Sequence, residues 1–388
     1  MPRRRALAVL FLTVFLTILG FGIIIPNLAY YARDFDATPF QIGFLMATYS
    51  VMQFFLCPWW GALSDRVGRK PILVVGLVGA GLSFVLFGLA WSLPVLFAAR
   101  ILSGALASAA LPTAMAYVAD VTDEKGRGAG MGLMGAAIGL GFTIGPAIGG
   151  ELSRFGHDVP FLASGALTLA TAALAILILE EPPEHRAAAH ARIRIGEAML
   201  GPLGSFFVLA FFVSFAMASI ETSFPQFIAD TLGLGAPAMG RMFTILGVIL
   251  IVLQGGALGR LINMMGEETI MMGGLALNIL GCFMLARAVS SSSVTAALVA
   301  AGVGNQIIRP TNSSLISKRT PYGHGASMGL LDSMDSLGRV LGPLAAGAVY
   351  TFGPGWPFNT AAAALALVTA IFLPSYLRRR GEAGEISS

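Results

Sequence analysis

Residues 61–70, Gly-Ala-Leu-Ser-Asp-Arg-Val-Gly-Arg-Lys, place four charged side chains between two apolar runs. The run before them ends in FFLCPWW (54–60), and the run after them reads PILVVGLVGAGLSFVLFGL (71–89). The opening returns about 195 positions later, altered, as GALGRLINMMGEE (256–268). A short charged stretch between two long apolar runs predicts a tight polar turn between two helices that lie in an apolar solvent.

The composition indicates that this solvent is a lipid bilayer. The 388 residues are 56% hydrophobic and 11% charged, with a mean hydropathy of +0.80, whereas soluble domains carry roughly 25% charged residues. A membrane-spanning helix needs ~20 apolar residues, and its backbone must be hydrogen-bonded within the segment, so the apolar runs are expected to be helices. The predicted fold is therefore an all-α polytopic membrane protein with twelve transmembrane helices. The twelve runs are 6–31, 39–62, 71–91, 94–118, 128–150, 158–179, 201–229, 238–263, 269–288, 293–317, 325–351 and 356–377.

The distribution of Lys and Arg predicts the orientation, because cytoplasmic loops carry an excess of both. With the N-terminus inside, 17 of the 24 Lys and Arg residues fall on the inner side and 4 on the outer side. Both termini are therefore expected in the cytoplasm, with the chain in the plasma (inner) membrane. The two cysteines, Cys57 and Cys282, lie in separate expected spans and suggest neither a metal site nor a disulfide framework.

The chain divides into two halves that repeat each other. The longest polar gap follows the sixth span, so we expect an N-terminal six-helix bundle over 1–179, a cytoplasmic linker over 180–200 and a C-terminal six-helix bundle over 201–388. The stretch 111–150 aligns with 309–347 with one gap, and glycines and prolines coincide along it. A repeat of six spans in one orientation predicts two pseudo-symmetric bundles with substrate bound between them near the membrane midplane, which is the plan of a transporter.

Three motifs fall at defined places in this plan. Residues 61–70 join spans two and three, Arg100 lies in AARILSGALAS (98–108) of span four, and span five carries a series of glycines with one proline. On these motifs the chain resembles the major facilitator superfamily, specifically its twelve-span drug/proton antiporter branch, which includes tetracycline and multidrug exporters. The resemblance covers essentially the whole chain and implies export by alternating access in exchange for protons. The span-five positions that carry it are Gly132, Gly141, Gly145, Pro146, Gly149 and Gly150.

The resemblance implies a gating role for the charged turn. A sharp turn favours glycine at Gly61 and Gly68, and Asp65, expected just beyond a helix end, can pair with Arg69 or with a neighbouring helix N-terminus. Such a contact holds one bundle geometry and breaks in another. The alternative is that the cations only anchor the turn at the inner face. The gating residues so predicted are Gly61, Asp65, Arg66, Gly68, Arg69 and Lys70.

The echo at 256–268 differs from the first copy in its charges. It has no acid equivalent to Asp65 and carries three inserted residues. Where the first copy has Arg69-Lys70, it has Glu267-Glu268. We interpret it as a latch that is eroded and reversed in charge. In span five, Gly141, Gly145 and Gly149 share one helix face, which permits the close approach of another helix, and Pro146 allows a bend. The alternative is that these residues serve packing alone, and the resemblance to antiporters is what favours export.

Ionisable residues inside spans are costly and are usually functional. At 1.5 Å per residue, Asp332 and Asp335 lie ~10 and ~15 Å from the inner end of span eleven, and Arg309 lies ~12 Å into span ten. The two acids share a helix face at i and i+3, so both should not ionise easily together, and one is expected to hold a proton. The alternative is a static Asp–Arg pair between spans. The in-span ionisable residues are Arg100, Glu221, Arg309, Asp332, Asp335 and Arg339.

The coupling acid is expected in the second half. The first span has no acid, and Glu221 stands at the position that is repeat-equivalent to Gly22. We therefore predict that Asp332, Asp335 or Glu221 carries the transported proton and that Arg309, Arg339 and Arg100 are the charge partners. This departs from the many relatives that place an acid in the first span.

The residues that line the substrate cavity are harder to predict from the sequence than the motifs are. An amphiphilic lining is predicted, although packing or lipid contact is the usual role of any single Phe. No P-loop, zinc-protease motif, nucleophile elbow or basic–aromatic patch is present, so neither an enzyme nor a nucleic-acid partner is indicated. The predicted lining is Phe21, Gln53, Phe215, Gln226, Gln254, Asn305, Gln306 and Asn312.

The leading hypothesis is a proton-coupled exporter of small amphiphilic, neutral or cationic compounds. It needs no cofactor, draws its energy from the proton gradient, works as a monomer in the lipid bilayer, and has a small molecule and protons as its partners. Two alternatives stay open: an uncoupled metabolite facilitator, and a lipid or lysolipid flippase of the same fold.

Overall fold

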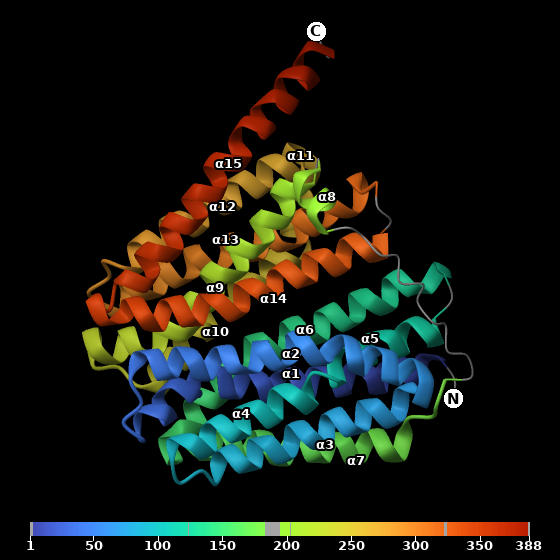
Figure 1. Ribbon diagram of the computed structural model, residues 1–388, viewed down its shortest axis with the longest axis vertical. Helices are drawn as coiled ribbons and strands as arrows, with labels where there is room; N and C mark the ends of the chain where they lie inside the picture. Colours follow the sequence, from blue (N-terminus) through green and yellow to red (C-terminus); the bar gives the residue numbers. More distant parts are fainter. Residues whose placement is uncertain (1–2, 123, 183–194, 202, 322–323, 387–388) are drawn as a thin grey trace. The chain divides into compact units, whose positions relative to one another are not determined.

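The computed structural model describes residues 3–122, 124–182, 195–201, 203–321 and 324–386 (Figure 1). Almost all of these residues are helical, and the described part of the chain contains no strand. The helices are α1 (Arg3–Arg33), α2 (Pro39–Val67), α3 (Arg69–Gly88), α4 (Leu93–Ala107), α5 (Ala110–Val121), α6 (Glu124–Leu152), α7 (Val159–Ile178), α8 (Ile195–Leu200), α9 (Gly204–Leu232), α10 (Ala236–Val252), α11 (Leu258–Met265), α12 (Glu267–Leu285), α13 (Ser291–Arg319), α14 (His324–Val349) and α15 (Trp356–Ile386). Short 3₁₀ turns follow α6 and α14, and a π-helical segment (Leu253–Ala257) joins α10 to α11.

The predicted all-α membrane fold is confirmed. Over the described residues, eleven helical segments are long and apolar enough to cross a membrane. Two of these segments, Leu93–Val121 and Ala236–Met265, each combine two consecutive helices. The eleven match eleven of the expected runs, and α14 occupies the remaining run, 325–351. α14 carries two acids and an arginine in its middle, which lowers its apolar character.

The chain forms two compact units. One comprises residues 1–188 together with 228–247, and the other comprises 189–227 together with 248–388. The predicted linker, 180–200, lies partly outside the described residues, and its described end contains the short helix α8.

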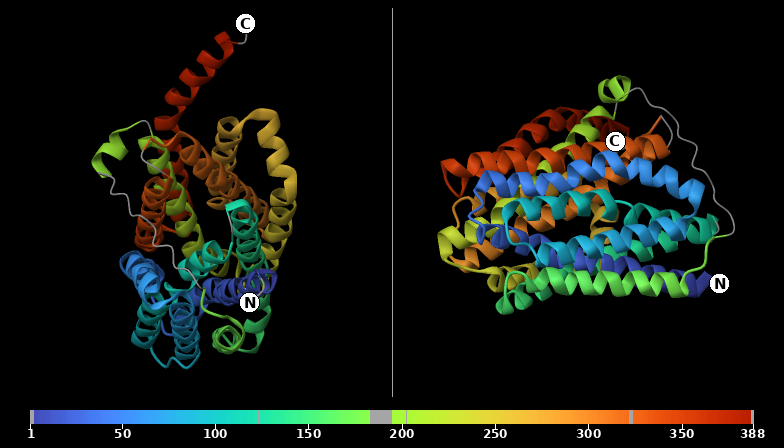
Figure 2. Two further views of the ribbon diagram at one scale, coloured as in Figure 1. Left: turned by 90° about the vertical axis from the view of Figure 1, so that its right-hand side faces the viewer. Right: turned by 60° about the horizontal axis from the view of Figure 1, so that its bottom comes forward.

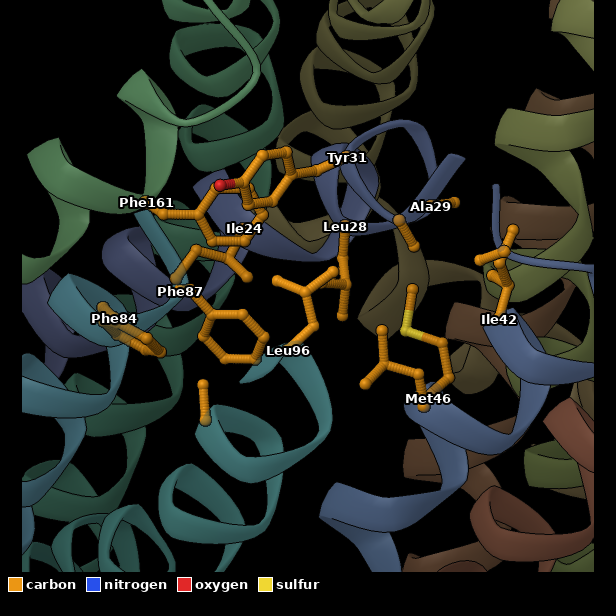
Figure 3. Packing of buried hydrophobic residues seen from close by; sticks show 14 of the residues in the cluster. Ile24, Leu28, Ala29, Tyr31, Ile42, Met46, Phe84, Phe87, Leu96 and Phe161 are labelled. Carbon is orange, nitrogen blue, oxygen red and sulfur yellow. The ribbon is translucent and has the colours of Figure 1, made fainter. Parts of the chain in front are cut away.

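The core of the first unit is built from aromatic and aliphatic side chains of α1, α2, α3, α4 and α7. Phe87 and Leu96 lie close to Ile24 and Leu28 of α1 (Figure 3), and all four are fully buried. α3 also lies along α7 (Figure 2). A Cβ on Gly81 would meet the side chain of Leu169 at 2.7 Å, so glycine allows this close approach.

Glycines also set the helix pair α12–α13 in the second unit. A Cβ on Gly281 would lie 2.3 Å from the backbone nitrogen of Ala301, and one on Gly304 would lie 2.6 Å from the carbonyl oxygen of Gly274. Helices in lipid gain little from burying apolar surface, so close backbone packing of this kind stabilises their association. A capping box at Ser290 defines the start of α13.

Candidate functional site

The charged stretch 61–70 is helical on both sides of a single residue. α2 continues to Val67, Gly68 adopts φ +114°, and α3 begins at Arg69. The prediction that Asp65 lies beyond a helix end is wrong, because α2 runs about one turn further than the apolar run does. The prediction of a turn at Gly61 is also wrong: this residue lies inside α2, with open space where a Cβ would be.

Arg69 is the centre of a buried ion-pair cluster. Its side chain is 4% exposed, and its guanidinium contacts Asp65 at 2.5 Å and Asp120 of α5 at 2.7 Å. Its Nη1 also donates to Ser64 Oγ at 2.7 Å. The predicted Asp65–Arg69 contact is therefore present, and Asp120 joins it from a distant part of the sequence. Arg69 is thus buried between two acids, whereas the choice between a gate and an anchor stays a prediction.

Glu181 holds the first turn of α3 in place. Its carboxylate accepts hydrogen bonds from the backbone nitrogens of Arg69, at 2.5 Å, and Lys70, at 2.9 Å. The Lys70 side chain in turn donates to the carbonyl of Ile176, at 2.8 Å. A Cβ on Gly68 would lie 2.7 Å from Glu181 Oε1, so glycine is required there both by its backbone angle and by this carboxylate.

Sequence reasoning missed Glu181 because it assigned this acid to the linker. The available signal was an acid directly after the sixth apolar run, within reach of a helix N-terminus that carries no side-chain cap of its own. A carboxylate at a helix N-terminus is stabilised by the free N–H groups and by the helix dipole.

The echo in the second half makes ion pairs of its own. Glu267, at the start of α12, contacts Lys318 at 2.9 Å and accepts from Ser314 at 2.7 Å, and Glu268 contacts Arg319 at 2.5 Å. The interpretation of an eroded latch is therefore wrong for the contacts, whereas the reversal of charge is correct. The first half places a cation at the helix start and the acid on the neighbouring helix, and the second half places them the other way round.

The glycine face of span five packs against α1. A Cβ on Gly145 would lie 2.8 Å from backbone atoms of Gly22, and one on Gly149 would lie 2.5 Å from the carbonyl oxygen of Ile23. Gly141 similarly faces Ile18. The predicted close approach of a neighbouring helix is thus confirmed. In the second unit, the repeat-equivalent Gly338 and Gly342 of α14 pack against α9 in the same manner.

The other span-five positions play different parts. Gly150 faces α10, where a Cβ would lie 2.7 Å from the carbonyl oxygen of Ala236. Gly132 faces open space, so packing does not require it to be a glycine. Pro146 lies inside the continuous helix α6.

Asp332, Asp335 and Arg309 line one cavity in the second unit. Arg309 contacts Asp335 at 3.1 Å, and Asp335 also accepts a hydrogen bond from Ser214, at 2.7 Å. Asp332 is exposed to the cavity and, within the described residues, makes no hydrogen bond or ion pair. The cavity has a volume of about 220 Å³. Its lining is Ala210, Val213, Ile308, Arg309, Asn312, Ser313, Met328, Leu331, Asp332 and Asp335.

The predicted grouping of the two acids with Arg309 is therefore correct in space. Asp335 pairs with Arg309 and accepts a hydrogen bond from Ser214, whereas Asp332 faces the cavity without a partner among the described residues. Glu221 and Arg339 do not line this cavity. Of the eight predicted cavity residues, Asn312 lines it, and its amide donates to the carbonyl of Phe206 at 3.1 Å.

The other predicted lining residues do not line this cavity of the second unit. Gln226 and Asn305 are buried, with Gln226 bonded to the carbonyl of Thr222 in its own helix. Gln254 is exposed in the π-helical segment, where sequence reasoning had expected a regular span. Phe21 packs on the Tyr49 ring with centroids 5.0 Å apart. Gln53, Phe215 and Gln306 are each partly exposed.

Arg100 is buried in α4 and is 3% exposed. Its guanidinium carbon lies 4.9 Å from the centroid of the Tyr49 ring, and its Nη2 lies 3.8 Å from the sulfur of Met46. Within the described residues of its own unit, its neighbours are therefore an aromatic ring and a thioether, and its predicted role as a charge partner of the in-span acids stays a prediction.

Membrane-spanning helices, close glycine packing that repeats between the two halves, and a polar cavity lined by acids define a multi-pass membrane transporter rather than an enzyme. The Major Facilitator Superfamily model matches residues 10–257 and, in a second match, residues 206–388. The chain belongs to this superfamily.

Individual proteins of known name are similar over nearly the whole chain. Multidrug resistance protein 1 of Bacillus subtilis is 29% identical over 379 residues, covering 96% of this chain and 97% of the relative. The quinolone resistance protein NorA of Staphylococcus aureus is 25% identical, covering 89% and 90%. Among solved structures, a bacterial homologue of the human lysosomal transporter Spinster superposes with a TM-score of 0.80 at 15% identity, covering 97% of each chain. That likeness shows the shared fold.

Proposed function

We propose that this protein exports small amphiphilic, drug-like compounds across the plasma membrane in exchange for protons, by alternating access of two six-helix bundles. Relatives that match almost end to end bear names of multidrug and quinolone resistance proteins, which supports a drug-like substrate. The distribution of Lys and Arg supports cytoplasmic termini. In this proposal the protein works as a monomer and draws its energy from the proton gradient without a cofactor.

One observation carries the proposed coupling: the unequal environment of two acids on one face of α14. Asp335 is held by Arg309 and Ser214, whereas Asp332 faces the cavity without a partner in the described residues. An unpaired acid in a cavity is free to take up a proton on one side of the membrane and release it on the other. Asp332 is therefore the proposed proton carrier, and Asp335 with Arg309 is the fixed pair beside it.

The mechanism follows from exchange at Asp332. When Asp332 is ionised, its charge in the membrane is costly unless a substrate or a proton compensates it. Compensation lowers the cost of the bundle rearrangement that closes the cavity on one side and opens it on the other. Protons entering down their gradient displace substrate outward, and the charged turn at Arg69 holds one of the two bundle geometries.

The experiment is quinolone transport in proteoliposomes with an imposed pH gradient. The parent protein should concentrate the drug, whereas Asp332→Asn should lose uphill transport and keep downhill exchange, because binding and rearrangement remain possible. Asp36→Asn is the matched control, since this exposed acid lies in a turn at φ 56°, a backbone angle that asparagine also adopts. If Asp332→Asn concentrates the drug as well as the parent does, Asp332 is not the carrier.

A further inference from the structure

Arg100 and Ser103 present three buried polar atoms that have no hydrogen-bond partner among the residues that the structure describes. These are Nε and Nη1 of Arg100 and Oγ of Ser103. Both residues lie on α4, three positions apart, so they share one face of the helix. Arg100 is 3% exposed and Ser103 is 0% exposed. Buried polar groups are almost always hydrogen-bonded, so this cluster of donors calls for an acceptor.

The surroundings of Arg100 do not compensate its charge. Its neighbours are the thioether of Met46, the ring of Tyr49, and the apolar cluster that includes Leu96 and Ala99. A guanidinium cannot be deprotonated in a protein, so this residue stays cationic wherever it lies. Burying such a group unpaired is expensive, and a contact with a ring face or a sulfur offsets only part of that cost.

Other buried or half-buried arginines of the same unit have carboxylates. Arg69 contacts Asp65 and Asp120, and Arg33 contacts Asp230 at 2.5 Å. The α1 helix, whose Ile24 and Leu28 pack in the same cluster as Ala99, contains no acid between Arg3 and Arg33. Among the described residues of its own unit, no carboxylate therefore pairs with Arg100.

We infer that Arg100 and Ser103 form a subsite for the carboxylate of an anionic or zwitterionic aromatic substrate. This inference rests on the proposed transport function and adds a chemical class to its substrate. A guanidinium binds a carboxylate through two parallel hydrogen bonds, and the hydroxyl of Ser103 supplies a further donor from the same helix face. Phe21 and Tyr49, which pack on each other and are both partly exposed, offer ring faces to the aromatic body.

Tyr49 also contacts the guanidinium of Arg100 directly. Its ring is partly exposed, and the guanidinium carbon of Arg100 lies 4.9 Å from the ring centroid, so an incoming carboxylate competes with this ring for the guanidinium. A cation–π contact is weaker than a bidentate charge-assisted hydrogen bond, so an incoming carboxylate is able to replace the ring.

The test is calorimetric binding of a matched pair, naphthalene-2-carboxylate and naphthalene-2-carboxamide, to purified full-length protein in detergent. The heat of protein-free micelles is subtracted, because both compounds partition into detergent. The parent should bind the carboxylate ~10-fold or more tightly than the amide, as expected for a hydrogen bond to a charged group. Equal affinities, or no binding of the carboxylate, would overturn the inference.

Variants locate the subsite. Arg100→Gln should lose this preference while still binding the amide, which also shows that the variant is folded, and Ser103→Ala should weaken carboxylate binding about fivefold. Arg154→Gln is the matched control, because this exposed arginine pairs with Glu151 at the surface. An unchanged preference in both Arg100→Gln and Ser103→Ala contradicts the assignment. If Arg100→Gln does not fold, Ser103→Ala decides alone.

Two further measurements distinguish a subsite for an aromatic carboxylate from a small-anion site and from the proposed proton coupling. Sodium acetate that displaces the naphthoate at equal concentration would identify a site for a small anion and overturn the assignment to an amphiphile. Binding is measured without a pH gradient, so the subsite stands or falls independently of proton-driven export. If the proposed function fails while the naphthoate preference depends on Arg100, the subsite is retained and only the coupling is lost.

Discussion

At the scale of single residues, the charged turn rests on a glycine and on a carboxylate from a distant part of the chain. Gly68 has a left-handed backbone angle, and the carboxylate of Glu181 occupies the space where a side chain would begin. Gly61, which opens the same ten-residue stretch, has neither constraint. Two glycines that look equivalent in the sequence therefore have different physical roles.

Substituting each glycine by alanine should give opposite results. Gly68→Ala should destabilise the protein by more than ~1 kcal/mol, because alanine is strained at this angle and its Cβ meets the Glu181 carboxylate. Gly61→Ala should be neutral or stabilising by up to ~1 kcal/mol, because alanine is the better helix former. Thermal unfolding of the purified variants measures both, and equal losses would show that Gly61 has a constraint beyond packing.

Removing the charge of Glu181 should loosen the start of α3. Glu181→Gln should cost ~1 kcal/mol, comparable to the loss of a helix N-cap, and should slow transport because Arg69 is positioned by the same turn. Glu151→Gln is the matched control, since it breaks an exposed pair that contributes little. A melting temperature equal to that of the parent for Glu181→Gln would mean that this cap is dispensable.

At the scale of helices, the contact between α6 and α1 depends on a column of glycines. Gly145→Ala should cost ~1–3 kcal/mol, because the added methyl lies 2.8 Å from the backbone of Gly22, which cannot move like a side-chain end. Gly132→Ala, on the same helix but facing open space, should cost nothing measurable. Thermal unfolding distinguishes them, and a Gly145→Ala variant as stable as Gly132→Ala would contradict the packing described here.

The features of helices that were predictable from the sequence are those that depend on local periodicity. The twelve apolar runs follow from their length, and the depth of Arg309 relative to Asp332 and Asp335 follows from the constant rise of a helix. The partners of Arg69 were only half predictable. Asp65 is four residues away, but Asp120 and Glu181 are 51 and 112 residues away in sequence, and no local pattern specifies such pairs.

Helix irregularity also limited the prediction. The sequence predicted one regular span over 238–263, yet Gln254 lies in a π-helical segment beside Gly256, whose φ is 130°. Adjacent glycines at 255 and 256 signalled flexibility in the backbone, but they do not specify which irregular geometry results. The interpretation of an eroded contact at 256–268 was wrong because it compared the two copies alone. It did not include Lys318 and Arg319 at the end of α13, which pair with Glu267 and Glu268.

At the scale of the whole molecule, each half has ion pairs at the start of its third span, but the charges are reversed between the halves. Cations at the start of α3 meet an acid on α5, whereas acids at the start of α12 meet cations at the end of α13. The second arrangement agrees with the helix dipoles, and the first opposes them and needs Glu181 as a cap. The first-half cluster is buried, whereas Lys318 and Arg319 of the second half are exposed, so breaking the first-half contacts should cost more unless another group compensates Arg69.

The central claim is that substrate and protons move in opposite directions through an acid in the second half. The most direct measurement records luminal pH and quinolone uptake together in proteoliposomes that contain a trapped pH-sensitive dye. Protein-free vesicles correct for protons that the drug carries itself. The account predicts that quinolone entering down its gradient makes the lumen more alkaline with the parent protein, whereas Asp332→Asn lets the drug enter with no change in pH. Drug entry without a change in luminal pH in the parent would contradict the claim.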